Sequence, residues 1–367
     1  MMKSVAQIIG QGRVQKNMPA WLNMRYAWKA NDELRDRELE FPEDTVQIKN
    51  LDYKEKLDKV RYESIIEDLA KQTGHRPADD NQAAYAPSPD SSSREILYSV
   101  CEDTTDVNSQ MYSSNSLMDL CAPLSFASDR NKKYPVIINV HGGAWFYGCK
   151  EIYSHYCMDL ARRGAVVVNF NYRLSPQNKY PAAIEDVSYL VKYLCDNAEG
   201  LGIDMKSFYM VGDSAGAQLA SNYCIIASNS KYRSELDFFT FDRLPERICL
   251  NCGVYDMHKN NGSIIDWYTR KDDGSCAISD EQRRLFFNQL DYITEDFPLT
   301  YLMYSVNDDL STHTVTLDRI MKERGVSHVT KAYGQERIDS GHIFHINLNN
   351  PEGNICNDEE WEFMMGK

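Results

Sequence analysis

The chain has 367 residues, 43% of them hydrophobic, which is enough to bury a large core. Its 40 basic and 54 acidic residues give a net charge of −14, which argues against nucleic acid as a partner. No stretch approaches the roughly 20 apolar residues of a membrane span, and the early apolar run 5–9 is too short for a secretory signal. Ten scattered cysteines are typical of reduced thiols. We therefore expect a soluble, cytoplasmic protein without a nucleic-acid or membrane partner.

Residues 1–94 differ in pattern from the remainder of the chain. They are charged and mostly helix-patterned, with Trp21, Met24 and Trp28 near helical spacing and a second helical stretch over about 53–71. The run 86–93, rich in proline and serine, is typical of a linker. We expect an N-terminal helical extension that packs on the main domain and forms part of a cap.

Residues 95–367 alternate apolar strands with helices, which predicts one α/β domain whose mostly parallel sheet is covered on both faces. The first two predicted strands follow one another without a helix, so we expect an antiparallel start. A helix over 182–194 opens with Pro181. The polar and aromatic stretch 257–297 is interpreted as a cap insertion between strands. The predicted strands are 95–100, 117–124, 136–140, 165–169, 208–211, 248–253, 299–306 and 328–332.

The most informative motif is Gly212-Asp213-Ser214-Ala215-Gly216, which lies between the predicted strand 208–211 and a helix-patterned stretch. Such a turn is so tight that its neighbours must nearly lack side chains, and it holds the serine hydroxyl clear of the backbone. The alternative is an ordinary Gly/Ser turn at a strand end. The strand before and the helix after the motif favour Ser214 as a nucleophile.

A serine hydroxyl needs a base to take its proton, and in this order of motifs the base follows the serine. His342, beside a glycine in the loop after the last predicted strand, is our first choice, and His345 is the alternative. For His313 and His328, a packing or surface role is the default interpretation.

The base in turn needs a carboxylate that orients it. We expect this acid at the carboxyl end of the strand 299–306, where Asp308 is the first choice and Asp309 the alternative. One of the two is expected to be structural, as a turn residue or a helix cap.

The motif His141-Gly142-Gly143-Ala144-Trp145 follows the strand 136–140 and predicts an oxyanion hole. Gly142 and Gly143 can bring bare backbone N–H groups close to a substrate, and the N–H of Ala215 is the expected third donor. The alternative for the two glycines is an ordinary tight turn. His141 is interpreted as a brace for this loop.

The aromatic run just past this loop is expected to line the substrate pocket, although core packing is equally consistent with it. Its residues are Trp145, Phe146 and Tyr147. The cap would set the accepted chain length and exclude water. Parts of 257–297 would contribute to it, together with Trp21, Tyr26 and Trp28.

Together, these motifs resemble the hormone-sensitive-lipase-like family of α/β-hydrolases over about residues 95–350. The resemblance implies an eight-stranded, mostly parallel sheet with a cap, and a triad of Ser214, Asp308 and His342. It also implies Gly142, Gly143 and Ala215 as oxyanion donors. The family usually has glycine where Ile343 stands. The matching motifs are 141–145, 171–176, 180–187, 212–216, 308–310 and 342–344.

The expected activity is that of a serine carboxylesterase acting on short-chain or small esters, with acetylated or feruloylated sugars as plausible substrates. This acyl-transfer mechanism implies no cofactor or metal. Cys249 and Cys252 form a lone C-x-x-C in a strand-like context, which favours core packing over a zinc or redox site. Two rival functions are a catalytically inactive ligand-binding protein on the same scaffold and a peptidase of related fold. The oligomeric state is left open.

Overall fold

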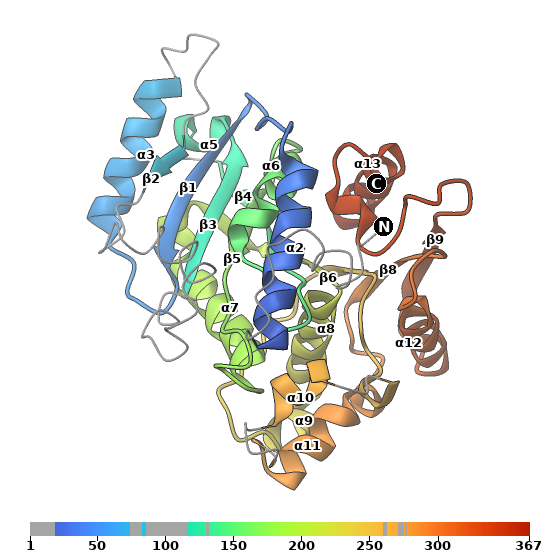
Figure 1. Ribbon diagram of the computed structural model, residues 1–367. Helices are drawn as coiled ribbons and strands as arrows, with labels where there is room; N and C mark the ends of the chain where they lie inside the picture. Colours follow the sequence, from blue (N-terminus) through green and yellow to red (C-terminus); the bar gives the residue numbers. More distant parts are fainter. Residues whose placement is uncertain are drawn as a thin grey trace.

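The computed structural model describes residues 19–73, 83–85, 116–129, 132–259, 263–270, 275 and 277–367, without the side chains of Tyr26, 72–73 and 83–85. Its centre is a nine-stranded sheet in the order β2-β1-β3-β5-β4-β6-β7-β8-β9 (Figure 1). The strands are β1 Thr45–Asp52, β2 Ala83–Tyr85, β3 Leu117–Pro123, β4 Tyr134–Val140, β5 Val166–Phe170, β6 Ile203–Asp213, β7 Arg247–Asn251, β8 Leu299–Ser305 and β9 His328–Tyr333.

The six strands from β5 to β9 in this order are parallel, whereas β3 pairs antiparallel with both β1 and β5. The central strands are buried along their length because they are nearly continuous runs of apolar residues. The predicted α/β class and mostly parallel sheet are therefore confirmed. The strand 117–124 was expected to pair with 95–100 in an antiparallel start, and the antiparallel partners that the structure describes for β3 are β1 and β5. Because these strands run the same way, their carboxyl ends gather the loops that follow β4, β6, β8 and β9 at one edge of the sheet.

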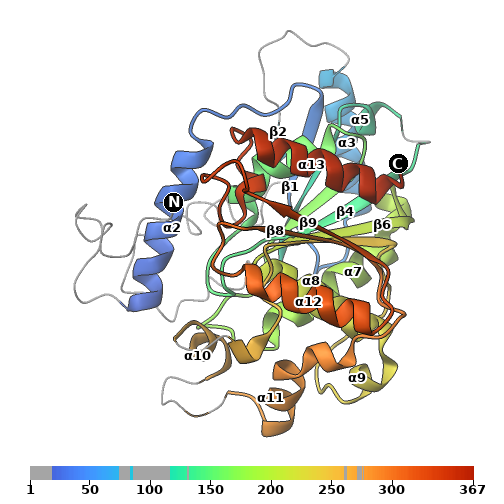
Figure 2. The ribbon, with the colours of Figure 1, turned by 90° about the vertical axis from the view of Figure 1, so that its right-hand side faces the viewer.

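Helices cover both faces of the sheet (Figure 2). On one face lie α6 Ser154–Ala161 and α13 Pro351–Met365, and on the other lie α7 Ala182–Leu201, α8 Ala215–Ser228 and α12 Ser311–Glu323. In the central strands β4, β5 and β6, residues that point to opposite faces belong to two separate hydrophobic clusters, one per face. The sheet is thus the middle layer of three, and it holds the loops at its edge rigidly.

The N-terminal segment contains a strand that the sequence did not predict. After α2 (Ala20–Asp36), the chain forms β1 inside the sheet and then α3 (Lys59–Thr73). This strand adds to the expected helices, and it pairs with β3 over most of its length. The domain boundary at residue 94 stays a prediction, and both the expected linker 86–93 and the expected strand 95–100 lie outside the described residues.

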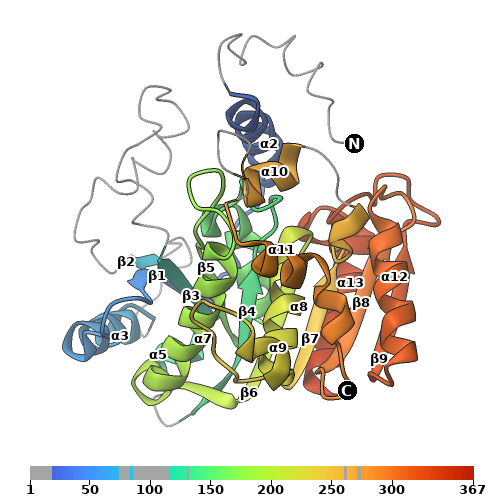
Figure 3. The same cartoon turned by 90° about the horizontal axis from the view of Figure 1, so that it is seen from below.

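The stretch 257–297 lies between β7 and β8, as expected for an insertion, and contains short helices. They are η3 Met257–Lys259, α10 Ser263–Thr269, α11 Asp280–Phe287 and η4 Gln289–Tyr292. Helix α10 lies beside α2 in the views of Figures 1 and 3. The helices of the two segments that were expected to form a cap therefore lie near each other at one edge of the sheet (Figures 2 and 3).

None of the helices that the structure describes is long and apolar enough to cross a membrane. The cysteines within the described ranges are free thiols, and most are buried. Cys249 and Cys252 both lie in the core, where Sγ of Cys252 is 3.7 Å from Sδ of Met303. This packing agrees with the interpretation of the C-x-x-C as part of the core.

Candidate active site

Ser214 lies at the turn between β6 and α8, with a strained backbone at φ 53° and ψ −116°. The neighbouring glycines allow this turn. A Cβ at Gly216 would lie 2.0 Å from the carbonyl oxygen of Val140, and one at Gly212 would lie 2.7 Å from the carbonyl oxygen of Gly216. The turn therefore needs glycine at both positions, and it seats the serine against the end of β4.

A hydrogen-bonded chain of three side chains joins three distant segments at this turn. Oγ of Ser214 lies 2.9 Å from Nε2 of His342, and Nδ1 of His342 lies 2.7 Å from Oδ2 of Asp308. When Nδ1–H donates to the carboxylate, Nε2 is left to accept the serine proton. The N–H of Leu310 donates to Oδ1 of Asp308 at 2.9 Å and helps to fix the carboxylate.

The electrostatics favour an ionised acid beside the imidazole. Burial alone would raise the pKa of Asp308, but the hydrogen bond and charge of His342 hold that pKa below its ordinary value. Asp308 is therefore a carboxylate at neutral pH. In that form it orients the ring of His342 and stabilises the imidazolium that forms when the serine loses its proton.

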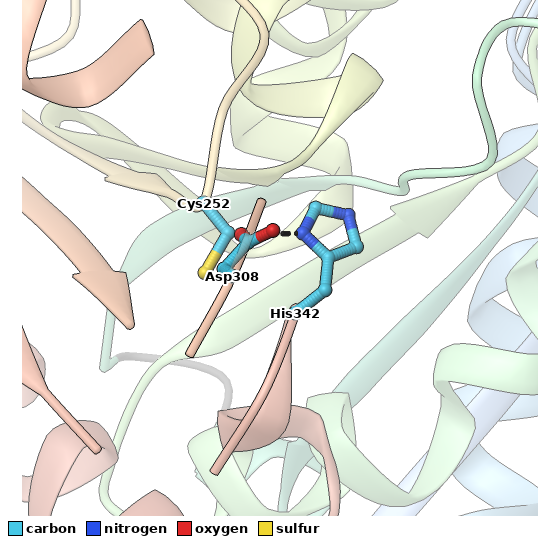
Figure 4. Close-up of side chains that lie close together, drawn as sticks. All are labelled: Cys252, Asp308 and His342. Carbon is cyan, nitrogen blue, oxygen red and sulfur yellow. Dashed lines mark hydrogen bonds and ion pairs between the residues drawn. The ribbon is translucent and has the colours of Figure 1, made fainter. Parts of the chain in front are cut away.

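Cys252 completes the surroundings of the carboxylate, as Figure 4 shows. Its thiol lies beside Asp308 (Figure 4), and burial raises the pKa of this thiol well above its ordinary value. Within the described ranges, Cys252, Asp308 and His342 are the group with metal-ligand spacing, since their donor atoms lie within 4.8 Å of one another. Two members of this group, Asp308 and His342, already share the 2.7 Å hydrogen bond that orients the imidazole.

The structure brings the three first-choice residues together and keeps their alternatives apart. Asp309 is exposed, whereas Asp308 is buried. His345 is fully buried, and its Nε2 lies 3.0 Å from Oδ1 of Asp213 instead of reaching Ser214. The geometry therefore favours Asp308 and His342, while the catalytic roles themselves stay predictions.

The two remaining candidate histidines have other partners. Nδ1 of His313 accepts the N–H of Asp256 at 3.2 Å. Nε2 of His328 lies 3.2 Å from Oδ1 of Asp318. Both contacts agree with the packing and surface roles expected from the sequence.

The loop after β4 differs in one respect from the expected oxyanion hole. The N–H of Gly142 donates to Oη of Tyr153 at 3.0 Å, so this donor is occupied. By contrast, no acceptor within the described residues binds the N–H groups of Gly143, Ala144 and Ala215. Tyr153 escaped the sequence analysis because a single tyrosine in a helical stretch carries no motif.

His141 braces this loop, as expected. Its Nδ1 donates to the carbonyl oxygen of Gly142 at 2.7 Å, and its ring stacks on Tyr172 with the ring centroids 4.1 Å apart. Burial lowers the pKa of His141 to about 4, so the ring is neutral. A buried, neutral ring that packs against an aromatic neighbour supports the loop.

A cavity of about 460 Å³ lies beside Ser214 and His342. Trp145 and Tyr147 line it, as expected, whereas Phe146 does not. Phe146 is fully buried and packs on Trp28 of α2, with the ring centroids 5.0 Å apart. The prediction for Phe146 therefore needs correction, because the ring points into the contact with the cap helix.

Helices α2 and α10 supply the cap side of the cavity. From α2 come Trp28, Asn31 and Asp32, and from α10 come residues 263–265. Oη of Tyr147 donates to Oδ2 of Asp32 at 2.5 Å and ties α2 to the loop after β4. Trp21 does not line the cavity, and the side chain of Tyr26 lies outside the described part of the chain.

Residues 119–314, more than half of the chain, match the BD-FAE family. The chain belongs to the BD-FAE family. The match runs from β3 into α12, so the BD-FAE region contains Ser214 and Asp308 and ends before His342. This match and the curated esterase relatives described next agree with the expected resemblance to hormone-sensitive-lipase-like α/β-hydrolases.

Among curated proteins, the BD-FAE chain is similar to an isoprenylcysteine alpha-carbonyl methylesterase of Arabidopsis thaliana, with 30% identity over 39% of this chain and 32% of the relative. It is also similar to a versiconal hemiacetal acetate esterase of Dothistroma septosporum, with 28% identity over 52% of this chain and 62% of the relative. The match thus spans about a third of the length of the methylesterase and somewhat less than two thirds of the length of the acetate esterase.

Among solved structures, esterase B of Lactobacillus rhamnosis is similar to the BD-FAE chain over nearly its whole length. The TM-score is 0.69 at 21% identity, and the match covers 95% of this chain and 94% of the other. At this identity the likeness establishes the α/β-hydrolase fold. Because the match extends over almost the entire chain, the shared fold includes the N-terminal segment as well as the sheet.

Proposed function

We propose that this BD-FAE member is a serine carboxylesterase that hydrolyses short-chain or small carboxylic esters through an acyl-enzyme. The observation that carries the proposal is the hydrogen-bonded chain from Oγ of Ser214 through His342 to Asp308, at 2.9 and 2.7 Å, beside a cavity that Ser214 and His342 line. Acyl transfer requires a nucleophile, a base and an orienting carboxylate. The esterase names of its relatives support the same activity.

In the proposed reaction, Nε2 of His342 takes the proton of Ser214 as Oγ attacks the ester carbonyl carbon. The imidazolium is stabilised by Asp308, and it then donates its proton to the leaving alcohol. Water enters next, loses a proton to Nε2 and attacks the acyl-enzyme carbonyl carbon. The tetrahedral intermediate then collapses, and His342 returns the proton to Ser214, which releases the acid.

Fixed N–H donors must stabilise the oxyanion in both halves of the reaction. We assign this role to Gly143, Ala144 and Ala215, whose N–H groups have no acceptor among the described residues. Gly142 is left out of the set, because its N–H already donates to Tyr153. The loop and the start of α8 would then face the oxyanion from two sides.

The proposed substrates include acetylated or feruloylated sugars. A cavity of about 460 Å³ is of ordinary small-molecule size. Trp28 and Trp145 offer aromatic surface for an acyl group or a sugar ring, and the side chains of Asn31 and Asp32 can bind hydroxyl groups. A wall that combines aromatic and hydrogen-bonding side chains suits esters that carry hydroxyls.

The test is an activity screen with the purified full-length chain and Ser214→Ala. The substrates are p-nitrophenyl esters of increasing acyl length, acetylated and feruloylated methyl glycosides, and a matching p-nitroanilide. We expect ester turnover that favours short acyl groups and falls by about 10⁴ or more in Ser214→Ala. Binding without turnover in the parent, or anilide cleavage as fast as ester cleavage, would favour the ligand-binding or the peptidase alternative instead.

A further inference from the structure

A second contact joins the two segments that carry the nucleophile and the base. Asp213 directly precedes Ser214, and His345 follows His342 by three residues. Nε2 of His345 lies 3.0 Å from Oδ1 of Asp213, and both side chains are 0% exposed. Ser214 and His342 line the cavity, whereas Asp213 and His345 do not. The buried pair thus links the same two segments away from the substrate.

Among the described residues, Asn251 contacts both side chains of the pair, and its Nδ2 lies 3.1 Å from Nε2 of His345. The other polar atom of each side chain, Oδ2 of Asp213 and Nδ1 of His345, has no hydrogen-bond partner among the described residues. Burial alone would lower the pKa of His345, but the carboxylate of Asp213 raises it above its ordinary value. Nδ2 of Asn251 donates to Oδ1 of Asp213 at 3.3 Å. The backbone carbonyl oxygen of Asn251 accepts the N–H of Ser214 at 2.8 Å.

Both segments hold strained residues that need support from their surroundings. Ser214 has φ 53°, and Ile343, the β-branched residue after His342, has φ 48°. Such conformations persist only where the surrounding structure over-determines them. On the base side, Nδ2 of Asn357 in α13 donates to the carbonyl oxygen of His345 at 3.0 Å. His345 is therefore anchored to α13 through its backbone and to the nucleophile turn through its ring.

We propose that Asp213 and His345 are positioning residues whose hydrogen bond holds the nucleophile turn and the base loop together and thereby sets the distance from Ser214 to His342. The proposal rests on the esterase function proposed above. His345 resembled a second candidate base in the sequence because it shares a loop with His342. In the structure it acts through Asp213 and touches neither the cavity nor Oγ of Ser214.

The test separates the hydrogen bond from the burial of a charge. Asp213→Asn keeps an acceptor at this position but removes the negative charge. When the hydrogen bond from residue 345 is then removed, no buried charge is left unpaired. In this background, His345→Gln keeps an N–H near the position of Nε2, whereas His345→Met has similar size and no donor. The measurements are kcat and KM for p-nitrophenyl acetate and the thermal unfolding temperature of each variant.

We expect the Gln variant to keep kcat within about threefold of the Asp213→Asn background, and the Met variant to lose about 100-fold in kcat at unchanged KM. If the pair had a purely structural role, the Met variant would show a lower unfolding temperature without a selective loss of kcat at unchanged KM. Equal kcat in the Gln and Met variants, or a loss confined to KM, would overturn the proposal.

If the Met variant does not fold, His345→Gln in the wild-type background decides the question. We expect a folded protein that keeps kcat within about tenfold of wild type, and a loss of about 100-fold or more in a folded protein would overturn the proposal. The wild type is assayed alongside. Failure of the wild type to turn over any ester would contradict the proposed function, whereas an active wild type with equal Gln and Met variants would contradict the positioning pair alone.

Discussion

Oη of Tyr153 accepts the backbone N–H of Gly142 at 3.0 Å, and this bond occupies a donor that the sequence assigned to the oxyanion hole. Tyr153 also lines the cavity beside Ser214. Through this bond, the tyrosine helps to hold the loop after β4 in place. The N–H groups of Gly143 and Ala144 remain available to a substrate.

Tyr153→Phe removes this acceptor and leaves the N–H of Gly142 unpaired. We expect the free energy of unfolding to fall by about 1 kcal/mol and kcat for p-nitrophenyl acetate to fall by no more than about tenfold. The control is Tyr134→Phe, which removes a hydroxyl that donates to Ser125 at 2.9 Å and should leave kcat unchanged. A rise in kcat for Tyr153→Phe would mean that the freed N–H of Gly142 serves the oxyanion after all.

Asp308→Asn and Asp309→Asn test the assignment of the acid. Asp308 accepts from Nδ1 of His342 at 2.7 Å, whereas Asp309 is exposed. We expect Asp308→Asn to lower kcat by about 10⁴, because an amide at this position favours the wrong tautomer of the imidazole. Asp309→Asn should leave kcat unchanged. Steady-state assays of both variants check this, and the reverse result would move the acid to Asp309.

The three central residues could be predicted from the sequence because each follows a strand that reads clearly as a strand. Ser214, Asp308 and His342 come after β6, β8 and β9, and parallel strands bring such positions to one edge of the sheet. Tyr153 and the pair of Asp213 and His345 could not be assigned in this way. Their roles arise from contacts across the fold that leave no periodic pattern and no motif.

Trp28→Ala tests whether α2 shapes the cavity. Trp28 lines the cavity, whereas Trp21 on the same helix does not, so Trp21→Ala is the matched control. We expect Trp28→Ala to raise the ratio of kcat/KM for larger over smaller esters by about tenfold, because an indole is removed from the wall. The ratio is measured for two series, one varied in the acyl group and one in the alcohol. An unchanged ratio in both series would remove α2 from the substrate site.

Glu360→Gln tests the buried charge near the pair of Asp213 and His345. Burial raises the pKa of Glu360 to about 7 from 4.5 in the unfolded chain. Between these values the folded state binds more protons, so the carboxyl group destabilises the wild type increasingly as pH rises from about 4.5 to about 7. We expect Glu360→Gln to be more stable than wild type by up to about 3 kcal/mol at pH 8. The gain should vanish toward pH 4.5.

The control for this prediction is the neighbouring Glu359, whose pKa is lowered: burial opposes the shift, while hydrogen bonds from Tyr333 and Tyr301 drive it. Its ionised form stabilises the folded chain above its unfolded pKa, and that stability is lost as pH falls through the folded pKa. Glu359→Gln should therefore destabilise at pH 8. Chemical denaturation at pH 5 and pH 8 measures both variants, and a pH-independent effect of Glu360→Gln would contradict the burial of an ionisable carboxyl.

Strand β1 and helix α13 mark the limits of sequence prediction for the fold. In β1 the apolar residues are interrupted by Gln47, whose side chain is buried because it donates to Asp119 in β3 at 3.2 Å. A polar residue with a tertiary partner cannot be distinguished from a surface residue by pattern alone. Helix α13 likewise buries Glu360, a residue type that a sequence places at the surface.

The most direct test of the account is covalent labelling of the intact chain with diethyl p-nitrophenyl phosphate, followed by peptide mass spectrometry. An activated serine hydroxyl attacks such a phosphate and releases p-nitrophenol. We predict one diethyl phosphoryl group on the peptide that contains Ser214, loss of esterase activity in proportion to labelling, and slower labelling of His342→Ala. A protein inactivated with its label on another residue, or an active protein that leaves Ser214 unlabelled, would contradict the account.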